Sequence, residues 1–75
     1  MKRIYRVEFE EKWTGCKDWM PDAKNVLANG DATQAIAKVR KNSLGASYVA
    51  EDTGTLQQCV GFRFTAVKVI AEAEI

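Results

Sequence analysis

The sequence predicts a small α+β domain: a three- or four-stranded, mostly antiparallel sheet with one helix packed on one face, in the order β-β-α-β. A period-two alternation predicts a strand over residues 2–12, and one apolar face predicts a helix over residues 31–42. A long aromatic and branched run from residue 60 onward predicts the last strand. The sequence contains no repeat and no linker, so a single domain is expected over residues 1–75.

The first strand is predicted from a regular alternation. Tyr5, Val7 and Phe9 are separated by Arg6 and Glu8. A period of two with aromatic and branched residues is typical of a half-buried strand. We therefore expect the aromatic side chains to face the core and the charged ones to face solvent.

The segment after this strand allows two interpretations. A loop is expected from Trp13 to Trp19, after which Pro21 restricts regular pairing to a strand start or an edge. Residues 23–28 form either a second strand antiparallel to the first or part of a short helix that begins at Pro21 and ends at Gly30. The strand is preferred, because the next helix needs an element on the sheet that leads into it.

The helix over residues 31–42 has start and end signals. Asp31 can accept hydrogen bonds from the free amides of the first turn, and Gln34 follows three residues later, as in a capping box. Asn42 or Gly45 is expected to end the helix in the left-handed conformation. The apolar positions on one face are Ala32, Ala35, Ile36 and Val39.

Between the helix and the last strand, residues 47–50 predict a short edge strand and residues 52–55 a turn. The tripeptide Asp52-Thr53-Gly54 matches the catalytic turn of aspartic proteases. Ala50 and Glu51 replace the apolar residues that usually precede that aspartate, so a surface turn is favoured.

The last strand contains an anomaly. On a regular strand Phe62 and Phe64 lie on one face, whereas Val67 and Val69 lie on the other. Either a bulge near Thr65-Ala66 shifts the register, or both faces are covered. Since one helix covers only one face, the second interpretation predicts a homodimer at micromolar concentration, with Val67 and Val69 at the contact.

Composition restricts the class of protein. Eleven basic and ten acidic residues leave a net charge of +1, unlike a general nucleic-acid binder. No apolar run approaches the roughly 20 residues of a membrane span. The charged residues near the start do not fit a secretory signal, so a cytoplasmic location, including that of a host cell, is expected.

The residue types that carry much catalytic chemistry are missing from the sequence. It contains no histidine, which excludes Ser-His and Cys-His pairs and most zinc sites. It also lacks the glycine-rich motifs that hold nucleotide phosphates. We expect no catalytic residues, no metal and no cofactor, and we interpret Cys16 and Cys59 as free thiols.

Two groups of residues are candidates for partner binding. Tryptophan is enriched at interface hot spots, which selects Trp13 and Trp19. The basic residues Lys38, Arg40 and Lys41 at the end of the helix could meet phosphates or an acidic partner. They could equally form a solvated helix end that the helix dipole stabilises.

One resemblance covers about half of the chain. A strand ending in V-x-A, followed by a capped helix with an A-I pair, resembles the DpnD/PcfM-like proteins of phages and plasmids. The residues that match this pattern are Val26, Ala28, Asp31, Ala35, Ile36 and Val39. The loop from Trp13 to Trp19 and the additional Gly30 depart from it. The resemblance implies no catalytic activity and no functional residues.

We therefore expect a non-catalytic phage- or plasmid-type accessory protein that binds another protein, inhibiting or modulating a host system. A small nucleic-acid-binding module is the alternative, and an enzyme is a more distant one. A nucleic-acid binder should gather Arg3, Lys38, Arg40, Lys41 and Arg63 on one surface. An enzyme should have a concave pocket with converging polar groups.

Overall fold

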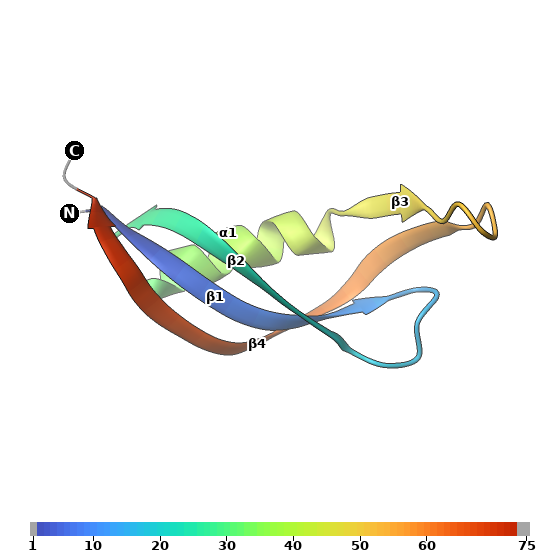
Figure 1. Cartoon of the computed structure of the whole chain (residues 1–75), viewed down its shortest axis with the longest axis horizontal. Coiled ribbons are helices and arrows are strands. Elements are labelled where there is room, and N and C mark those ends of the chain that lie inside the picture. The colour runs from blue at the N-terminus through green and yellow to red at the C-terminus, as the bar shows by residue number, and fades with distance from the viewer. Residues whose placement is uncertain (1, 74–75) are drawn as a thin grey trace.

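A computed structural model describes residues 2–73 of the protein. It contains β1 (Lys2–Trp13), β2 (Met20–Asn29), α1 (Ala32–Leu44), β3 (Ser47–Val49) and β4 (Leu56–Ala73). The strands form one antiparallel sheet in the order β2-β1-β4-β3, and α1 packs on one face of it (Figure 1). The α+β fold and the β-β-α-β order are thus confirmed. The molecule is elongated, about 46 by 21 by 15 Å.

β1 is the central strand of the three that pack against the helix. It pairs with β2 on one side and with β4 on the other. Tyr5, Val7 and Phe9 are buried, whereas Arg6 and Glu8 between them are only partly buried. The predicted alternation is therefore confirmed, and β1 supplies the centre of the core.

Residues 23–28, for which the sequence allows a strand or a helix, belong to a strand, as preferred. Over its whole length β2 pairs antiparallel with β1, with Tyr5 opposite Val26 and Arg3 opposite Ala28. Pro21 lies within β2, and an edge strand tolerates proline because its outer side needs no backbone donor. Gly30 follows with φ +110°, a conformation that favours glycine, and the chain turns there into the helix.

Asp31 caps α1, as predicted. Its Oδ1 accepts a hydrogen bond of 3.1 Å from the backbone N–H of Thr33. The helix continues to Leu44, two residues beyond the predicted end. The expected left-handed ending is wrong: Gly45 has φ −95°, and its N–H donates to the carbonyl of Ser43. The helix therefore closes with a tighter last turn and needs no positive φ.

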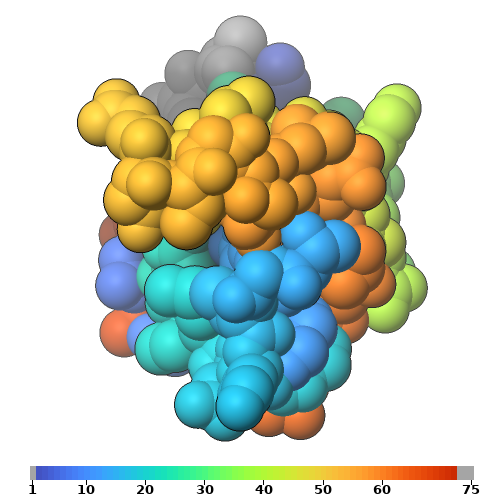
Figure 2. Space-filling view, turned by 90° about the vertical axis from the view of Figure 1, so that its right-hand side faces the viewer, coloured from blue at the N-terminus to red at the C-terminus, as the bar shows by residue number. Residues whose placement is uncertain are grey.

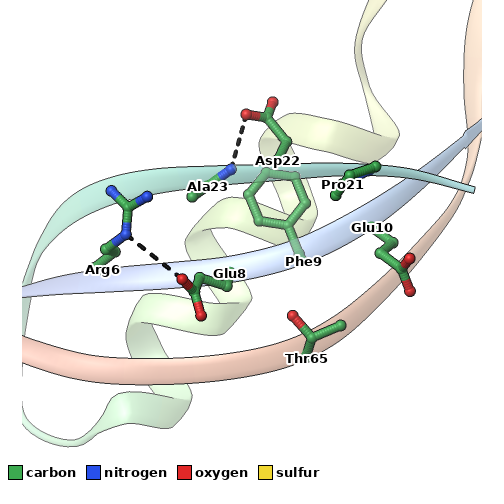
Figure 3. A pocket seen from close by; sticks show the side chains of 8 residues that line it. All are labelled: Arg6, Glu8, Phe9, Glu10, Pro21, Asp22, Ala23 and Thr65. Atoms are coloured by element: carbon green, nitrogen blue, oxygen red, sulfur yellow. Dashed lines mark hydrogen bonds and ion pairs between the residues drawn. The ribbon is translucent and has the colours of Figure 1, made fainter.

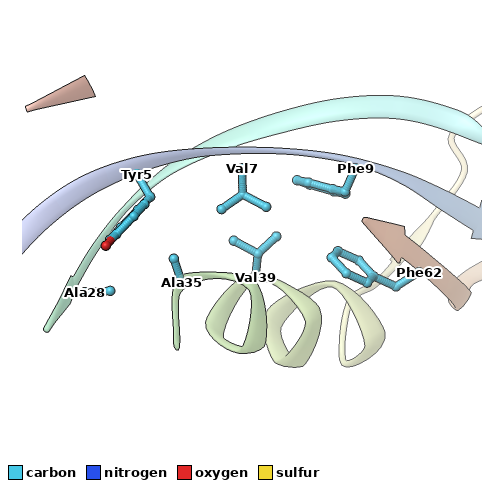
Figure 4. Packing of buried hydrophobic residues seen from close by; sticks show 7 residues of the cluster. All are labelled: Tyr5, Val7, Phe9, Ala28, Ala35, Val39 and Phe62. Carbon is cyan, nitrogen blue, oxygen red and sulfur yellow. The ribbon is translucent and has the colours of Figure 1, made fainter. Parts of the chain in front are cut away.

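The core lies between α1 and the three long strands. Figure 4 shows the strands arching over the helix, with Val39 pointing at Val7 and with Phe62 near Phe9. The rings of Phe9 and Phe62 stack with centroids 5.1 Å apart. The Tyr5 hydroxyl donates to the carbonyl of Gly30, 3.1 Å away, and so ties β1 to the start of the helix. The buried cluster is Tyr5, Val7, Phe9, Ala28, Ala35, Val39 and Phe62.

A bulge resolves the anomaly in the last strand. Phe9 pairs with Phe64 but Glu8 pairs with Ala66, so Thr65 has no partner on β1. The extra residue places Val67 on the same face as Phe64, and Val67 packs against the core. The bulge interpretation is confirmed, and the argument that both faces of β4 are apolar is wrong. The apolar residues of β4 therefore no longer support a homodimer in this way, and the homodimer stays a prediction.

The end of the molecule beyond the helix is a hairpin of β3 and β4. The edge strand β3 is confirmed, and it pairs with residues 56–58 of β4. β4 therefore begins at Leu56, earlier than the expected Val60. The turn over residues 52–55 is also confirmed, with φ +68° at Gly54.

Candidate protein-binding surface

The structure places the two tryptophans on opposite faces of the sheet. Trp13 follows Phe9 and Glu11 at every second position of β1, on the helix side. Its ring contacts Tyr48 of β3 edge to face, with centroids 5.4 Å apart. Trp13 therefore supports the hairpin and does not form a joint anchor with Trp19.

Trp19 lies on the face without the helix. The guanidinium of Arg63 is 4.3 Å from the centre of its ring, and the Arg63 Nε donates to the Glu10 carboxylate at 2.7 Å. The ring also covers Gly61, where an added Cβ would come within 2.9 Å of Trp19 Cη2. A glycine is required at that position for this close approach, and the contacts fix Trp19 half-buried on the sheet.

The basic residues of the helix do not form one patch. Lys38 Nζ donates to the backbone carbonyl of Leu27 in β2, 2.7 Å away. Arg40 instead stands over the ring of Phe62 in β4, 5.7 Å from its centre. Lys41 is exposed in the last turn, where a positive charge suits the helix dipole. These three side chains thus point to different sides of the helix.

The other two arginines that a nucleic-acid surface would need are also engaged elsewhere. Arg3 pairs with Glu72 at 3.4 Å, toward the opposite end of the sheet from the hairpin. Arg63 is held by Glu10 on the face without the helix. The five basic residues therefore occupy several surfaces, and a protein that binds phosphates along a groove needs them on one.

An exposed apolar surface on the hairpin was missed by the sequence analysis. Val49 and Leu56 are direct cross-strand partners, so their side chains share one face. Val60 follows further along β4, at a register shift against β1. The exposed fractions of the three side chains are 60%, 54% and 59%. We call Val49, Leu56 and Val60 the hairpin surface. Its signal in the sequence is the pair of apolar residues that flank the 50–55 turn.

Figure 2 shows this end of the molecule from outside. Yellow and orange atoms of the β3–β4 hairpin make up the upper half, and blue and cyan atoms of the β1–β2 loop make up the lower half. Hydrogen bonds join the halves: the backbone N–H of Thr14 donates to the carbonyl of Gln58, and the N–H of Gln58 donates to the Thr14 hydroxyl. The loop thus holds the hairpin in place beyond the end of α1.

A shallow depression of about 530 Å³ lies on the sheet face without the helix (Figure 3). Arg6 pairs with Glu8 at 3.7 Å and Glu10 pairs with Arg63 at 2.7 Å, while Asp22 Oδ1 accepts a hydrogen bond of 2.8 Å from the backbone N–H of Ala23. A catalytic pocket instead holds polar groups that converge on one point, whereas Arg6, Glu8 and Glu10 are engaged in ion pairs along the open sheet surface. The depression therefore gives no support to an enzyme.

Both cysteines are free thiols in the structure, as predicted. Cys59 is buried, and its Sγ lies 3.8 Å from a carboxylate oxygen of Glu11. Burial and the neighbouring carboxylate raise the pKa of the Cys59 thiol. Within residues 2–73, no cluster of three or more acidic, cysteine or histidine side chains forms a metal site.

Comparison with protein-family models, with curated proteins and with solved structures finds no match for this chain. The resemblance to the DpnD/PcfM-like proteins therefore stays a prediction. Among the described residues, no helix is long and apolar enough to cross a membrane.

Proposed function

We propose that this protein is a non-catalytic binding module that attaches to another protein through the hairpin surface. The observation that carries the proposal is the exposure of three large apolar side chains, Val49, Leu56 and Val60, on one hairpin. Apolar side chains gathered on a surface and rimmed by polar ones are typical of a protein interface. Gln58 lies two residues after Leu56, on the same face, and supplies a polar group beside it.

The partner that fits this surface is a protein with its own apolar patch. Full burial of a valine or leucine side chain contributes roughly 1.5–3 kcal/mol, so three such side chains can support a specific contact. Trp19 lies on the same face over Gly61, near Val60, and can extend the contact. The accessory role in a phage or plasmid, acting on a host system, rests only on the resemblance over about half of the chain.

The surface can be tested by affinity capture from the native host with matched baits. The variant Leu56→Lys places a charge in the hairpin surface, and Lys41→Ala changes an exposed residue of the helix. Leu56→Lys should release the captured protein, whereas Lys41→Ala should retain it. Binding through apolar contacts should also survive a rise in salt that removes contacts to nucleic-acid phosphates.

Two outcomes contradict the proposal. One is a captured protein that binds Leu56→Lys as well as the unmodified chain. The other is captured material that nuclease treatment or salt releases and that Lys41→Ala weakens, which would favour the nucleic-acid-binding alternative. Circular dichroism of each bait checks that it is folded.

A further inference from the structure

β4 has an open edge along most of its length. On one side it pairs with β1 as far as Ala73, whereas on the other side β3 pairs with residues 56–58 only. In the part of the chain that the structure describes, no strand covers residues 61–73 on this second side. The backbone N–H and C=O groups of an uncovered edge form a template for another strand.

Apolar side chains accompany this edge on the helix side. Phe64 and Val69 are 43% and 46% exposed, although they lie opposite the buried Phe9 and Tyr5 of β1. The helix reaches Phe62 and partly covers Val67, but the exposed fractions show that it leaves the other two partly open. A strand added at the edge would continue the sheet and cover both of them.

The register of β4 makes it complementary to itself. In an antiparallel pair, residues directly opposite each other carry side chains on the same face. If Lys68 lies opposite Lys68 of a second copy, Val67 lies opposite Val69 of that copy. Phe64 then lies opposite Glu72. Phe64, Val67, Val69 and Glu72 are all on the helix side, because their partners on β1 are at odd-numbered positions, which face the helix.

The bulge at Thr65 selects this register over its neighbour, which has Val67 on the axis. Thr65 points to the same side as Glu8, away from the helix (Figure 3). With Lys68 on the axis, Thr65 lies opposite Ala71, which is on that side too. With Val67 on the axis, Thr65 would lie opposite Val69, whose side chain is on the other face. A register with Lys68 at the axis therefore pairs Thr65 with a residue of its own face, as it does Phe64 and Val67.

We propose that two copies of this chain form a homodimer by antiparallel pairing of their β4 edges, with Lys68 at the two-fold axis. The two sheets join into one, both helices lie on the same side, and Val67 and Val69 of each copy meet beside the axis. The pairing ends before it reaches β3, so the hairpin surface stays free for another protein. This interface therefore does not depend on the proposed function.

The two Lys68 side chains oppose the pairing, since like charges directly opposite each other are destabilising. Dimerisation should therefore strengthen as salt is added, and Lys68→Thr should tighten it several-fold. Lysines and bulges also protect the edges of monomeric proteins against pairing. That is the alternative that the experiment must exclude.

Sedimentation equilibrium of the full chain over a range of concentrations tests the proposal. Val69→Lys places a charge in the contact of both copies and should weaken dimerisation by about 100-fold or more. Leu27→Lys is the matched control, because Leu27 is similarly exposed on β2, the opposite edge strand. It should leave dimerisation unchanged.

Disulfide cross-linking tests the axis without relying on a destabilised variant. In a Cys16→Ser, Cys59→Ser background, Lys68→Cys should form an intermolecular disulfide under mild oxidation, and Val67→Cys should do so far less. A single 8.4 kDa species at every concentration and salt would overturn the proposal. So would a dimer that survives in folded Val69→Lys, that Leu27→Lys abolishes, or that cross-links through Val67→Cys instead.

Discussion

The helix-covered part of the sheet and the hairpin beyond it use the same kinds of residue for different purposes. Val7 is completely buried between β2, β4 and the helix, whereas Val49 in β3 is 60% exposed. The difference follows from length: α1 ends at Leu44, while the chain continues through β3 and returns along β4. Apolar residues near the helix therefore stabilise the fold, and those beyond it are available to a partner.

The two regions are nevertheless joined. Trp13 continues the core face of β1 into the hairpin, where it contacts Tyr48. Cys59 lies where they meet, buried beside Glu11. The fold therefore supports the hairpin through a few contacts at one end, which is sufficient to position it but adds little buried area.

The largest effect is expected when equivalent valines in the helix-covered sheet and in the hairpin are compared. Val7→Ala removes two methyl groups from the centre of the core and should lower the free energy of unfolding by about 2–3 kcal/mol. Val49→Ala makes the same change on the hairpin and should cost less than about 0.5 kcal/mol. Thermal and urea denaturation followed by circular dichroism measure both. Equal losses in the two variants would show that the hairpin belongs to the same core.

The second test concerns the start of the helix. Asp31→Ala removes the acceptor for the N–H of Thr33 and the negative charge at the positive end of the helix dipole, so it should cost about 1 kcal/mol. In a domain of this size, that is a decrease in melting temperature of roughly 4–8 °C. Asp31→Asn, which keeps an acceptor, should recover most of the loss. An unchanged melting temperature in Asp31→Ala would contradict the observed cap.

Local patterns in the sequence predict the helix-covered part well. The alternation in β1 identifies which side chains are buried, and Asp31 marks the start of the helix, because both signals depend on residues close together in the chain. The end of the helix was less predictable. The sequence predicts a left-handed ending at Asn42 or Gly45, but a glycine also closes a helix in the ordinary helical region.

The features of the fold and of the candidate site that local patterns do not predict depend on pairing between distant segments. The bulge at Thr65 exists because of how β4 aligns with β1, and no pattern within β4 alone decides between a bulge and two covered faces. Contacts with distant segments also separate Trp13 from Trp19, which are only six positions apart: Trp13 contacts Tyr48 of β3, and Trp19 contacts Arg63 of β4. Val49 and Leu56 become one surface only when the turn between them brings β3 onto β4.

Cys59 gives a pH test of the region where the core and the hairpin meet. Burial raises the pKa of its thiol, so above the ordinary thiol pKa the unfolded chain loses this proton while the folded chain keeps it. Stability contributed by the protonated thiol is therefore complete at neutral pH and decreases as the pH rises through the folded pKa. Urea denaturation from pH 7 to 10.5 should show this decrease in the unmodified chain.

Cys59→Ser should remove that part of the pH dependence, and Cys16→Ser is the control that should keep it. With both thiols free, the double variant should still fold, with a modest loss of packing. An identical pH profile in Cys59→Ser would contradict the assignment, and loss of two protons in non-reducing mass spectrometry would contradict the free thiols.

The expected effect that is smallest for the stability of the whole domain is confined to the hairpin. Gly54 has φ +68°, and an added Cβ would meet no atom within 4 Å, so Gly54→Ala tests backbone conformation alone. The left-handed conformation costs an alanine roughly 1–2 kcal/mol, and the turn should open more readily. Because the hairpin contributes little to the core, we expect amide exchange in β3 to accelerate by about five-fold or more, while exchange in β1 is unchanged. Exchange that accelerates equally in β1 would show that the hairpin and the helix-covered sheet unfold as one unit.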